Sequence, residues 1–558
     1  MCGIHLAIQP ASSALHPIDS LLRRRLRNRG PDHIGHVEAR FADAILAFTS
    51  TVLALRGSTI TTQPFHHTSS GSVLCWNGEA WKIDGRNVHG NDGAELFALF
   101  NQPDTDILDT IRAIEGPFAL VLFDKPSGQL FYARDRLGRR SLVTRRDEAD
   151  GSLRLSSIPE EPDPSWVEVE ADGIYVLDLN MLFSPSAPAP VRHPWVAVPD
   201  LSQGMSGIGV FNIQIPQDSD SEPSAWPEAA AVPALRNLLT ESLRLRILGV
   251  PEPPSTDQGI DTRVAVLFSG GLDCTVLARL CHDLLPATQG MDLLNVAFEN
   301  PRIASQTEKR DAQDLDSLYE ACPDRVTGRK SFAELLRVCP ERAWRFIAID
   351  IPFAEATAHR YKVISLMHPH NTEMDLSIAY ALYFAARGEG KCNIAEEAGL
   401  RSRNNCSTPA RILLSGLGAD ELFGGYVRHA TAYSRRGYQG LLEELLLDVG
   451  RLGKRNLGRD DRVMGNWGRE VRFPFLDERL VRWAVELPVW QKCDFGRAGT
   501  PHPGDDSDIE PAKRVLRLLA MTLGMTSVAR EKKRAIQFGS RTAKMESSKV
   551  KGTTLISL

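Results

Sequence analysis

Hydrophobic runs are arranged differently in the two halves of the chain. Up to about residue 185 they are short, separated by turn residues, and fall at 44–48, 73–76, 119–123 and 173–179. Helical spacing is found there only near 18–29 and 94–100. Many short strands with few helices predict stacked sheets with helices outside, an α+β architecture.

The second half alternates strand and helix patterns. A helical pattern at 229–248 precedes a strand that begins at Arg263, and further strands are expected at 293–298, 346–351 and 411–414. Such alternation predicts an α/β doubly wound parallel sheet, whose ligands bind beyond the carboxyl ends of the strands. Between the halves the chain is rich in Pro, Ser and Gly, which is typical of connecting segments. We therefore expect domains at 1–185 and 228–558, with a linker at 186–227.

Three segments are polar and lack periodicity. Residues 386–409 and 496–508 read as irregular, mobile loops, and the basic, Ser/Thr-rich residues after Ser540 as a frayed end.

Composition narrows the class of protein. A chain of 558 residues, 42% hydrophobic and 24% charged, can bury large cores and should form two to three domains. Its net charge of −5 argues against nucleic acid as the main partner. The nine cysteines form no CxxC pair, which speaks against structural zinc and disulfides. Because neither a signal sequence nor an apolar run of membrane-spanning length is present, we expect a cytoplasmic protein.

The stretch 264–277, VAVLFSGGLDCTVL, carries the clearest chemical signal. Its apolar start predicts a strand buried on both faces, and leucines at helical spacing follow. Gly270 and Gly271 let backbone N–H groups approach a phosphate, with Ser269 beside them and Asp273 available for Mg²⁺. The loop lacks the lysine of the common P-loop, so it fits pyrophosphate leaving ATP. A simple tight turn is the alternative.

The N-terminus offers a second candidate site. Removal of Met1 would leave Cys2 with a thiol and an α-amine, whose ordinary pKa of about 8 suits a base for that thiol. Asn77 and Gly78 could hold a tetrahedral oxyanion with a side-chain amide and a backbone N–H. A hairpin turn is the alternative for this Asn-Gly pair.

Six ordered motifs resemble class II glutamine amidotransferase domains: MCGI, RNRGPD, TTQP, WNGEAW, NDGAE and ARDRLGRRSL. The resemblance implies an Ntn-type αββα sandwich. It implies Cys2 as nucleophile, Asn77 and Gly78 as the oxyanion hole, and Glu79 and Asp92 as holders of the glutamine α-amino group. Residues 29–32 would form a structural turn beside the site.

Residues 228–558 resemble the synthetase domain of asparagine synthetases, through LFSGGLDCTVL, LLSGLGADELFGGY, EVRFPFLDERLV, AKRVLRLLA and AREKKRAIQFG. The motifs of both halves, and their order, resemble the asparagine synthetase domain-containing protein 1 family more than the housekeeping asparagine synthetase. The resemblance implies an ATP pyrophosphatase (PP-loop) fold, the substrates ATP, glutamine and a small carboxylate such as aspartate, Mg²⁺ as cofactor, and allows a homodimer. It assigns pyrophosphate and ATP binding to Ser269, Gly270, Gly271, Asp273, Val296 and Lys533, and the metal to Asp273 and Asp420.

Two positions depart from these families. The arginine that grips the glutamine carboxylate falls on Thr51, and Arg56, five residues further along a strand, is expected to point to the opposite face. The glutamate that assists amide formation falls on Leu417, which cannot transfer a proton. Three hypotheses follow: an asparagine-forming ligase, a nucleotide-binding interaction protein of impaired activity, and an amide ligase for another acceptor.

Overall fold

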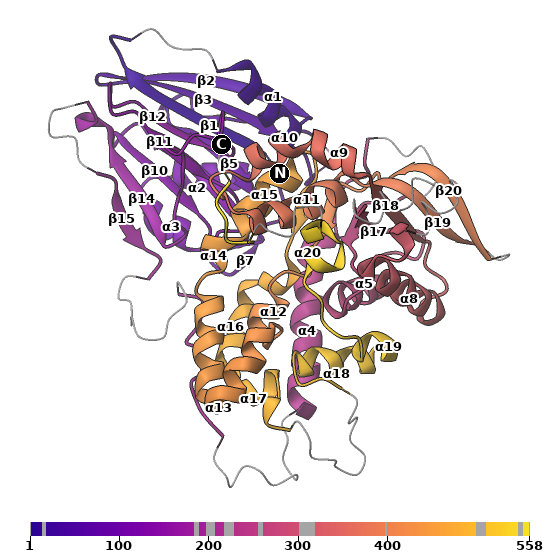
Figure 1. Ribbon diagram of the computed structural model, residues 1–558. Coiled ribbons are helices and arrows are strands. Elements are labelled where there is room, and N and C mark those ends of the chain that lie inside the picture. The colour runs from indigo at the N-terminus through magenta and orange to yellow at the C-terminus, as the bar shows by residue number, and fades with distance from the viewer. Residues whose placement is uncertain are drawn as a thin grey trace.

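A computed structural model describes residues 2–13, 18–57, 59–183, 189–196, 207–216, 228–254, 261–300, 318–396, 399–497, 509–544 and 551–556. Two sheet-based domains lie side by side, and a group of helices that includes α12, α13 and α16 extends below them (Figure 1).

The N-terminal domain is built on two six-stranded antiparallel sheets. One has the order β13-β11-β12-β1-β3-β2 and the other β15-β14-β10-β9-β5-β4. The strands of the first sheet are β1 (Gly3–Pro10), β2 (His33–Phe41), β3 (Ala44–Val52), β11 (Val143–Arg146), β12 (Leu153–Ser156) and β13 (Val167–Glu168). Those of the second sheet are β4 (Phe65–His66), β5 (Val73–Gly78), β9 (Phe118–Asp124), β10 (Gln129–Arg134), β14 (Gly173–Asp178) and β15 (Val191–Pro194).

Helices cover the outer faces of these sheets. The inward residues of both sheets share one apolar core, which includes Phe48 and Val121. Helices α2 (Asp92–Phe100) and α3 (Ile107–Arg112) bury Leu96 and Ile111 in a second core against β5 and β9. Helix α1 (Ser20–Arg29) packs on β3 and turns Leu22 and Leu26 toward the C-terminal domain. The expected αββα layering is therefore present. A small sheet of β6 (Lys82–Ile83), β7 (Arg86–Asn87) and β8 (Ile114–Glu115) completes the domain.

The C-terminal domain centres on a seven-stranded sheet of order β20-β19-β18-β17-β16-β21-β22. Strands β16 (Val264–Leu267), β17 (Met291–Phe298), β18 (Trp344–Ile351), β21 (Ile412–Leu414) and β22 (Glu470–Arg472) are mutually parallel, as expected. Asn295 contacts α8 (Pro323–Val338), while Val296 faces α11 (Glu373–Arg387). Because successive strand residues point to opposite faces, these two helices cover opposite faces of the sheet.

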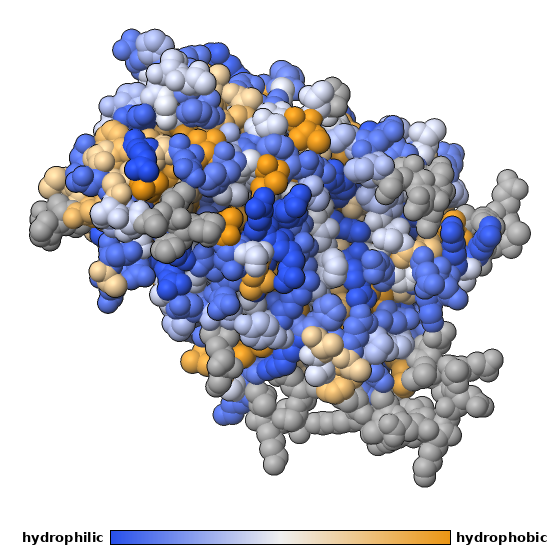
Figure 2. Space-filling view, turned by 90° about the horizontal axis from the view of Figure 1, so that it is seen from above, coloured by the Kyte–Doolittle hydropathy of each residue, from blue (hydrophilic) through white to orange (hydrophobic). Residues whose placement is uncertain are grey.

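The remaining helices surround this sheet. They are α4 (Glu228–Ile247), α5 (Leu272–Leu284), α9 (Phe353–Ala358), α10 (Arg360–Met367), α12 (Ala419–Phe423), α13 (Val427–Val449), α14 (Leu452–Arg455), α15 (Leu457–Gly465), α16 (Glu478–Glu486), α17 (Val489–Lys492), α18 (Arg514–Thr522), α19 (Thr526–Ala529) and α20 (Ile536–Gly539). None of the helices in the described ranges is both long and apolar enough to cross a bilayer. Polar residues predominate on the face shown in Figure 2, with apolar ones scattered among them.

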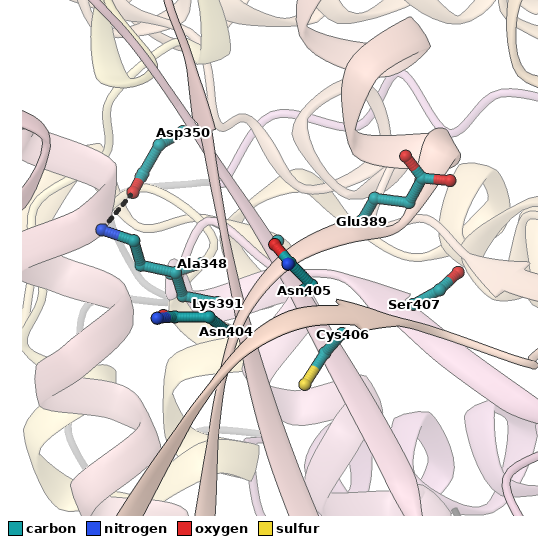
Figure 3. A pocket seen from close by; sticks show the side chains of 9 residues that line it. Ala348, Asp350, Glu389, Lys391, Asn404, Asn405, Cys406 and Ser407 are labelled. Carbon is teal, nitrogen blue, oxygen red and sulfur yellow. Dashed lines mark ion pairs between the residues drawn. The ribbon is translucent and has the colours of Figure 1, made fainter. Parts of the chain in front are cut away.

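The prediction of an irregular loop at 386–409 is wrong. This segment forms an antiparallel hairpin of β19 (Glu389–Glu396) and β20 (Gly399–Ser407), which extends the sheet at β18. Its hydrophobic content is too low to reveal a strand, because the hairpin projects from the body of the domain (Figure 1). It walls a polar pocket of about 760 Å³, in which Lys391 lies 4.0 Å from Asp350 (Figure 3).

The chain after Ser540 is also more ordered than expected where it is described. The backbone of Thr554 accepts a hydrogen bond from Glu373 N, and Ile556 N donates to Asn371 O at 2.7 Å. These contacts tie residues 551–556 to the start of α11. The expected loop at 496–508 lies outside the described residues from position 498 onward.

Parts of the connecting segment belong to the domains on either side. Strand β15 extends the second N-terminal sheet, and buried Trp195 donates from Nε1 to Ala171 O at 2.8 Å. Ile208 and Phe211 are buried in the C-terminal core.

Buried ion pairs join the two domains. Arg29 of α1 contacts Asp461 at 2.6 Å, and Arg140 contacts Glu470 of β22 at 3.1 Å. Arg472, also on β22, pairs with Glu470 at 2.6 Å and reaches across to Glu79 at 3.0 Å. Charges buried in this way are costly unless each is paired, so the contacts allow one relative placement of the domains.

The Glu470 carboxylate provides a test of this interface. Because Glu470→Gln leaves Arg140 and Arg472 buried beside a neutral group, we expect a loss of about 3–5 kcal/mol, measured as a lower midpoint of thermal unfolding. The matched control is Glu443→Gln, which removes an exposed partner of Arg436 and should leave the midpoint unchanged. Equal midpoints for both variants would contradict the assigned role of Glu470.

Candidate active sites

Cys2 immediately precedes β1, and Gln63 links it to β5 of the other sheet. The amide Nε2 of Gln63 is 3.9 Å from its sulfur, and Gln63 Oε1 accepts a hydrogen bond from Trp76 N on β5. Arg29 Nε contacts the carbonyl of Cys2 at 3.4 Å. Desolvation by these surroundings raises the pKa of the thiol. A base would therefore have to remove the thiol proton before this sulfur could act as a nucleophile.

The Asn77 side chain belongs to the residue after Trp76, whose N–H is joined to Cys2 through Gln63. It is fully buried, and neither its Nδ2 nor its Oδ1 has a hydrogen-bond partner within the described parts of the chain. Buried amides are nearly always satisfied, so such a group fits a ligand contact. Gly78 follows, where a Cβ would lie 2.6 Å from Pro117 O and collide with β9. The strand end therefore requires glycine at position 78.

Glu79 is held by two arginines from different domains. Arg56 Nε donates to its Oε2 at 2.7 Å, and Arg472 Nη2 to its Oε1 at 3.0 Å. Burial raises the pKa of Glu79 to about 7, against the opposing effect of Arg472. Arg56 and Arg472 also stack over the ring of Trp81.

The prediction that Arg56 points away from this site is wrong. Strand β3 ends at Val52, so the alternation of faces does not extend to residue 56, and the loop turns the guanidinium toward Glu79. Thr51 has a structural role instead: its hydroxyl accepts from Gly3 N at 3.0 Å and donates to Leu26 O at 2.7 Å.

Asp92 shapes the loop that follows β5. Its Oδ2 accepts hydrogen bonds from Ala80 N at 2.8 Å and from Trp76 Nε1 at 3.1 Å. Burial raises the pKa of this carboxyl group, against the opposing effect of Arg56. Asp92 thus holds the Trp76 side chain before Asn77 and the Ala80 backbone after Glu79.

The expected turn at 29–32 ties the N-terminal site to the other domain. Asp32 accepts from Ala54 N at 2.7 Å and pairs with Arg411 at 2.7 Å, while Arg29 joins Cys2 O to Asp461. Its structural role is consistent with the sequence prediction.

In the second domain, the Ser269–Gly271 loop follows β16 and opens α5. Gly270 has φ +78°, and a Cβ there would lie 2.4 Å from the backbone of Gly328. Gly271 is the N-cap of α5 without a side-chain cap, so the first N–H groups of this helix remain available to an anion.

Two lysines hold the carboxylates beside this loop. Lys513 Nζ lies 2.8 Å from both oxygens of Asp273 and 2.7 Å from Asp420 Oδ1. Lys533 Nζ lies 3.1 Å from Asp420 Oδ2. Burial alone would raise the pKa of Asp420, but the two lysines outweigh it and hold the pKa below its usual range.

Asp273 and Asp420 are the candidate ligands for a cation, but their oxygens are already engaged by a lysine. Carboxylate oxygens suit Mg²⁺, yet Lys513 already contacts three of the four oxygens. The two aspartates could hold the ion only if Lys513 moved toward an incoming phosphate. Among the described residues no group of three or more His, Cys, Asp or Glu side chains forms a metal site.

A cleft of about 660 Å³ connects the phosphate loop to a hydrophobic wall. Val296, which was expected beside adenine, lines it together with Leu294 and α11 residues such as Ala381 and Leu382. Leu417 lines the same cleft, and its N–H donates to Ser415 Oγ at 3.3 Å. All residues predicted for the ATP site therefore converge on one cavity or its edge.

Three residues of these sites escaped the sequence analysis. Lys513 sits in the AKRVLR motif but adopts φ +55° at the N-cap of α18, which directs it into the site. Arg472 lies in the EVRF motif, yet only the fold brings it to Glu79. Glu421 is buried, and Tyr426 Oη donates to it at 2.6 Å. The sequence contains the motifs to which these residues belong, but it does not show where their side chains point in the fold.

Gly270 gives a test of the phosphate loop. Gly270→Ala should weaken ATP binding at least tenfold and lower the unfolding midpoint, because the added methyl group combines left-handed strain with a backbone clash. Gly249→Ala is the control: φ is +70° there, but nothing lies within 4 Å of the new Cβ. If both variants bind ATP like the wild type, by equilibrium titration, the loop is not a nucleotide site.

Comparisons with known proteins find a family match in each half of the chain. The family described as "Glutamine amidotransferase domain" matches residues 1–161, and "Asparagine synthase" matches residues 434–552. A glutamine phosphoribosylpyrophosphate amidotransferase from B. subtilis is 13% identical over 57% of this chain and 70% of its own. At a TM-score of 0.26 the two structures are not closely similar.

Full-length relatives are more informative. Human "Asparagine synthetase domain-containing protein 1" is 31% identical, covering 98% of this chain and 96% of the relative. "Asparagine synthetase domain-containing protein YML096W" of Saccharomyces cerevisiae is 30% identical over 90% of this chain and 84% of its own length. With both family domains and a match along nearly the whole chain, this protein belongs to the family of asparagine synthetase domain-containing proteins.

Proposed function

We propose that the chain is a glutamine-dependent amide ligase that converts ATP to AMP and pyrophosphate, with aspartate as the reference acceptor and asparagine and glutamate as products. One residue carries the proposal. The Arg472 guanidinium binds Glu79 in the glutamine site, and the Arg472 carbonyl accepts the N–H of Ser415, which opens the loop that carries Leu417. Arg472 thus contacts both proposed sites, one through its guanidinium group and the other through its carbonyl group.

The proposed glutaminase step uses the Cys2 thiol. The α-amine freed by removal of Met1 takes the thiol proton, and the sulfur attacks the glutamine amide carbon. Asn77 Nδ2 and the Gly78 N–H stabilise the oxyanion. The C–N bond then breaks, ammonia leaves with the proton, and water hydrolyses the thioester to glutamate.

Glutamine recognition follows from the charges around Glu79. We assign the α-ammonium group to Glu79, supported by Asp92, and the α-carboxylate to Arg56. Arg56 presents a fork of N–H donors that fits a carboxylate, and it is charged and anchored on Trp81. Arg56 therefore supplies the carboxylate contact that Thr51 cannot make.

The proposed ligase step takes place in the cleft. The purine lies against Val296, and the Ser269–Gly271 loop with Lys513 and Lys533 holds the phosphates that leave. Mg²⁺, bound by Asp273 and Asp420, would neutralise phosphate charge. The acceptor carboxylate attacks the α-phosphorus, pyrophosphate leaves, and ammonia then displaces AMP from the acyl carbon.

The experiment that tests this function separates the two half-reactions. Wild-type protein with ATP, Mg²⁺, aspartate and glutamine should release glutamate and pyrophosphate, whereas Cys2→Ala should lose both with glutamine but retain pyrophosphate release with ammonium. Nucleotide binding without pyrophosphate from either nitrogen source, with aspartate and with longer acidic acceptors alike, would instead identify a non-catalytic, nucleotide-binding protein.

Arg56 allows a sharper test of glutamine binding. Arg56→Gln should raise the KM for glutamine about 10- to 100-fold, because a charge-assisted contact worth about 1.5–3 kcal/mol is lost, and should change kcat less. Arg86→Gln, at an exposed arginine of β7 in the same domain, is the matched control. An unchanged KM in Arg56→Gln would remove Arg56 from the site.

A further inference from the structure

The cleft that contains the proposed ATP site has two chemically different ends. At one end, Leu294, Val296 and the α11 residues Ala381, Leu382 and Ala385 form an apolar wall. At the other end, α13 and α14 contribute a basic group consisting of Arg428, Arg451, Lys454 and Arg455. The phosphate loop and Leu417 line the same cleft. An ATP molecule accounts for the apolar end and the loop, and leaves the basic group unexplained.

Most charges around the basic end are neutralised by a carboxylate. Arg428 pairs with Asp448 at 2.6 Å, and Lys454 pairs with Glu170 of the N-terminal domain at 3.1 Å. Buried Arg459 pairs with Asp375 at 2.6 Å, on the wall of the cleft. The protein therefore balances its charges here wherever an acidic partner is within reach.

Arg451 and Arg455 are exceptions. No carboxylate in the described ranges lies within ion-pair distance of either guanidinium, and neither side chain makes a hydrogen bond there. They lie four residues apart at the ends of one helical turn, because Arg455 N donates to Arg451 O at 3.1 Å. Residues at this spacing share a helix face, so both guanidinium groups can bind one anionic ligand.

A path of side-chain contacts leads from the reacting centre to these arginines. From Glu421, next to Asp420, contacts run through the Tyr426 hydroxyl at 2.6 Å and the Tyr426 ring to Arg428 at 3.9 Å. Arg428 contacts Asp448, whose carbonyl accepts the N–H of Arg451 at 3.2 Å. An aromatic ring, a guanidinium and a carboxylate thus stand between the two places. An acceptor that contacts both places must therefore extend past these three groups.

Helix α14 also lies where the domains meet (Figure 1). Arg134 Nη1 contacts Gly453 O at 3.5 Å, and Lys454 reaches Glu170. The basic end of the cleft is therefore fixed by both domains.

We propose that Arg451 and Arg455 form an anion subsite for the acceptor, which is an extended acid such as an acidic peptide, with its reacting carboxylate beside Leu417 and a second anionic group at α14. This inference rests on the proposed ligase function and replaces aspartate as the preferred acceptor. The longer acceptor uses the cleft between the two ends, whereas aspartate fills only the inner part.

The test measures binding without turnover. Isothermal titration calorimetry would be carried out with the full chain, Mg²⁺ and the α,β-methylene analogue of ATP, which cannot release pyrophosphate, and with aspartate or the dipeptide aspartyl-glutamate as probe. The dipeptide should bind at least tenfold more tightly than aspartate. Arg451→Gln and Arg455→Gln should each weaken the dipeptide at least fivefold and change the affinity for the ATP analogue less than twofold.

Arg435→Gln is the matched control, because Arg435 is an exposed arginine of α13 that does not line the cleft, and it should behave like the wild type. Equal affinity for both probes, no binding of either, or unchanged dipeptide binding in both cleft variants would overturn the inference. A weaker affinity for the ATP analogue in the cleft variants would also overturn it, because the arginines would then be phosphate ligands.

Failure of the ligase function gives a different result. If the dipeptide binds through Arg451 and Arg455 but no pyrophosphate forms with ATP and either nitrogen source, the anion subsite stands and the proposed ligase activity is wrong.

Discussion

The chain of buried ion pairs from Glu79 through Arg472 and Glu470 to Arg140 is the interaction on which the rest of this structure depends. Each member is almost completely buried, so none can lose its partner without leaving an uncompensated charge in a low-dielectric interior. The chain therefore specifies how the two domains dock. It also places Glu79 of the N-terminal candidate site in direct contact with Arg472 of β22, the strand that pairs with β21.

The same physical principle explains the resting state of the second site. Asp273 and Asp420 would repel one another, and Lys513 and Lys533 neutralise the pair. Under the proposed ligase function, these lysines are the cations that an incoming triphosphate would engage. The site would then exchange one set of ion pairs for another when nucleotide binds.

Parts of the candidate sites could be predicted from the sequence where the residues that form them are neighbours along the chain. The Ser269–Asp273 loop and Asn77 are identified because each follows a hydrophobic strand, and Cys2 because removal of Met1 would give it a free α-amine. Arg56 was misplaced because strand alternation was extended beyond Val52, and β19 and β20 were missed because a projecting hairpin buries too few residues to show a period of two. The Arg472–Glu79 contact joins residues 393 apart, which no local pattern encodes.

The central claim is that glutamine hydrolysis and acceptor activation work as one reaction across the docked domains. The most direct measurement is transfer of ¹⁵N from amide-labelled glutamine into the amide of the product, in the presence of ATP, Mg²⁺, aspartate or aspartyl-glutamate, and excess unlabelled ammonium. The account predicts that most product carries ¹⁵N despite the competing ammonium. Product that carries the isotope ratio of the bulk ammonium, or no amide product at all, would contradict it.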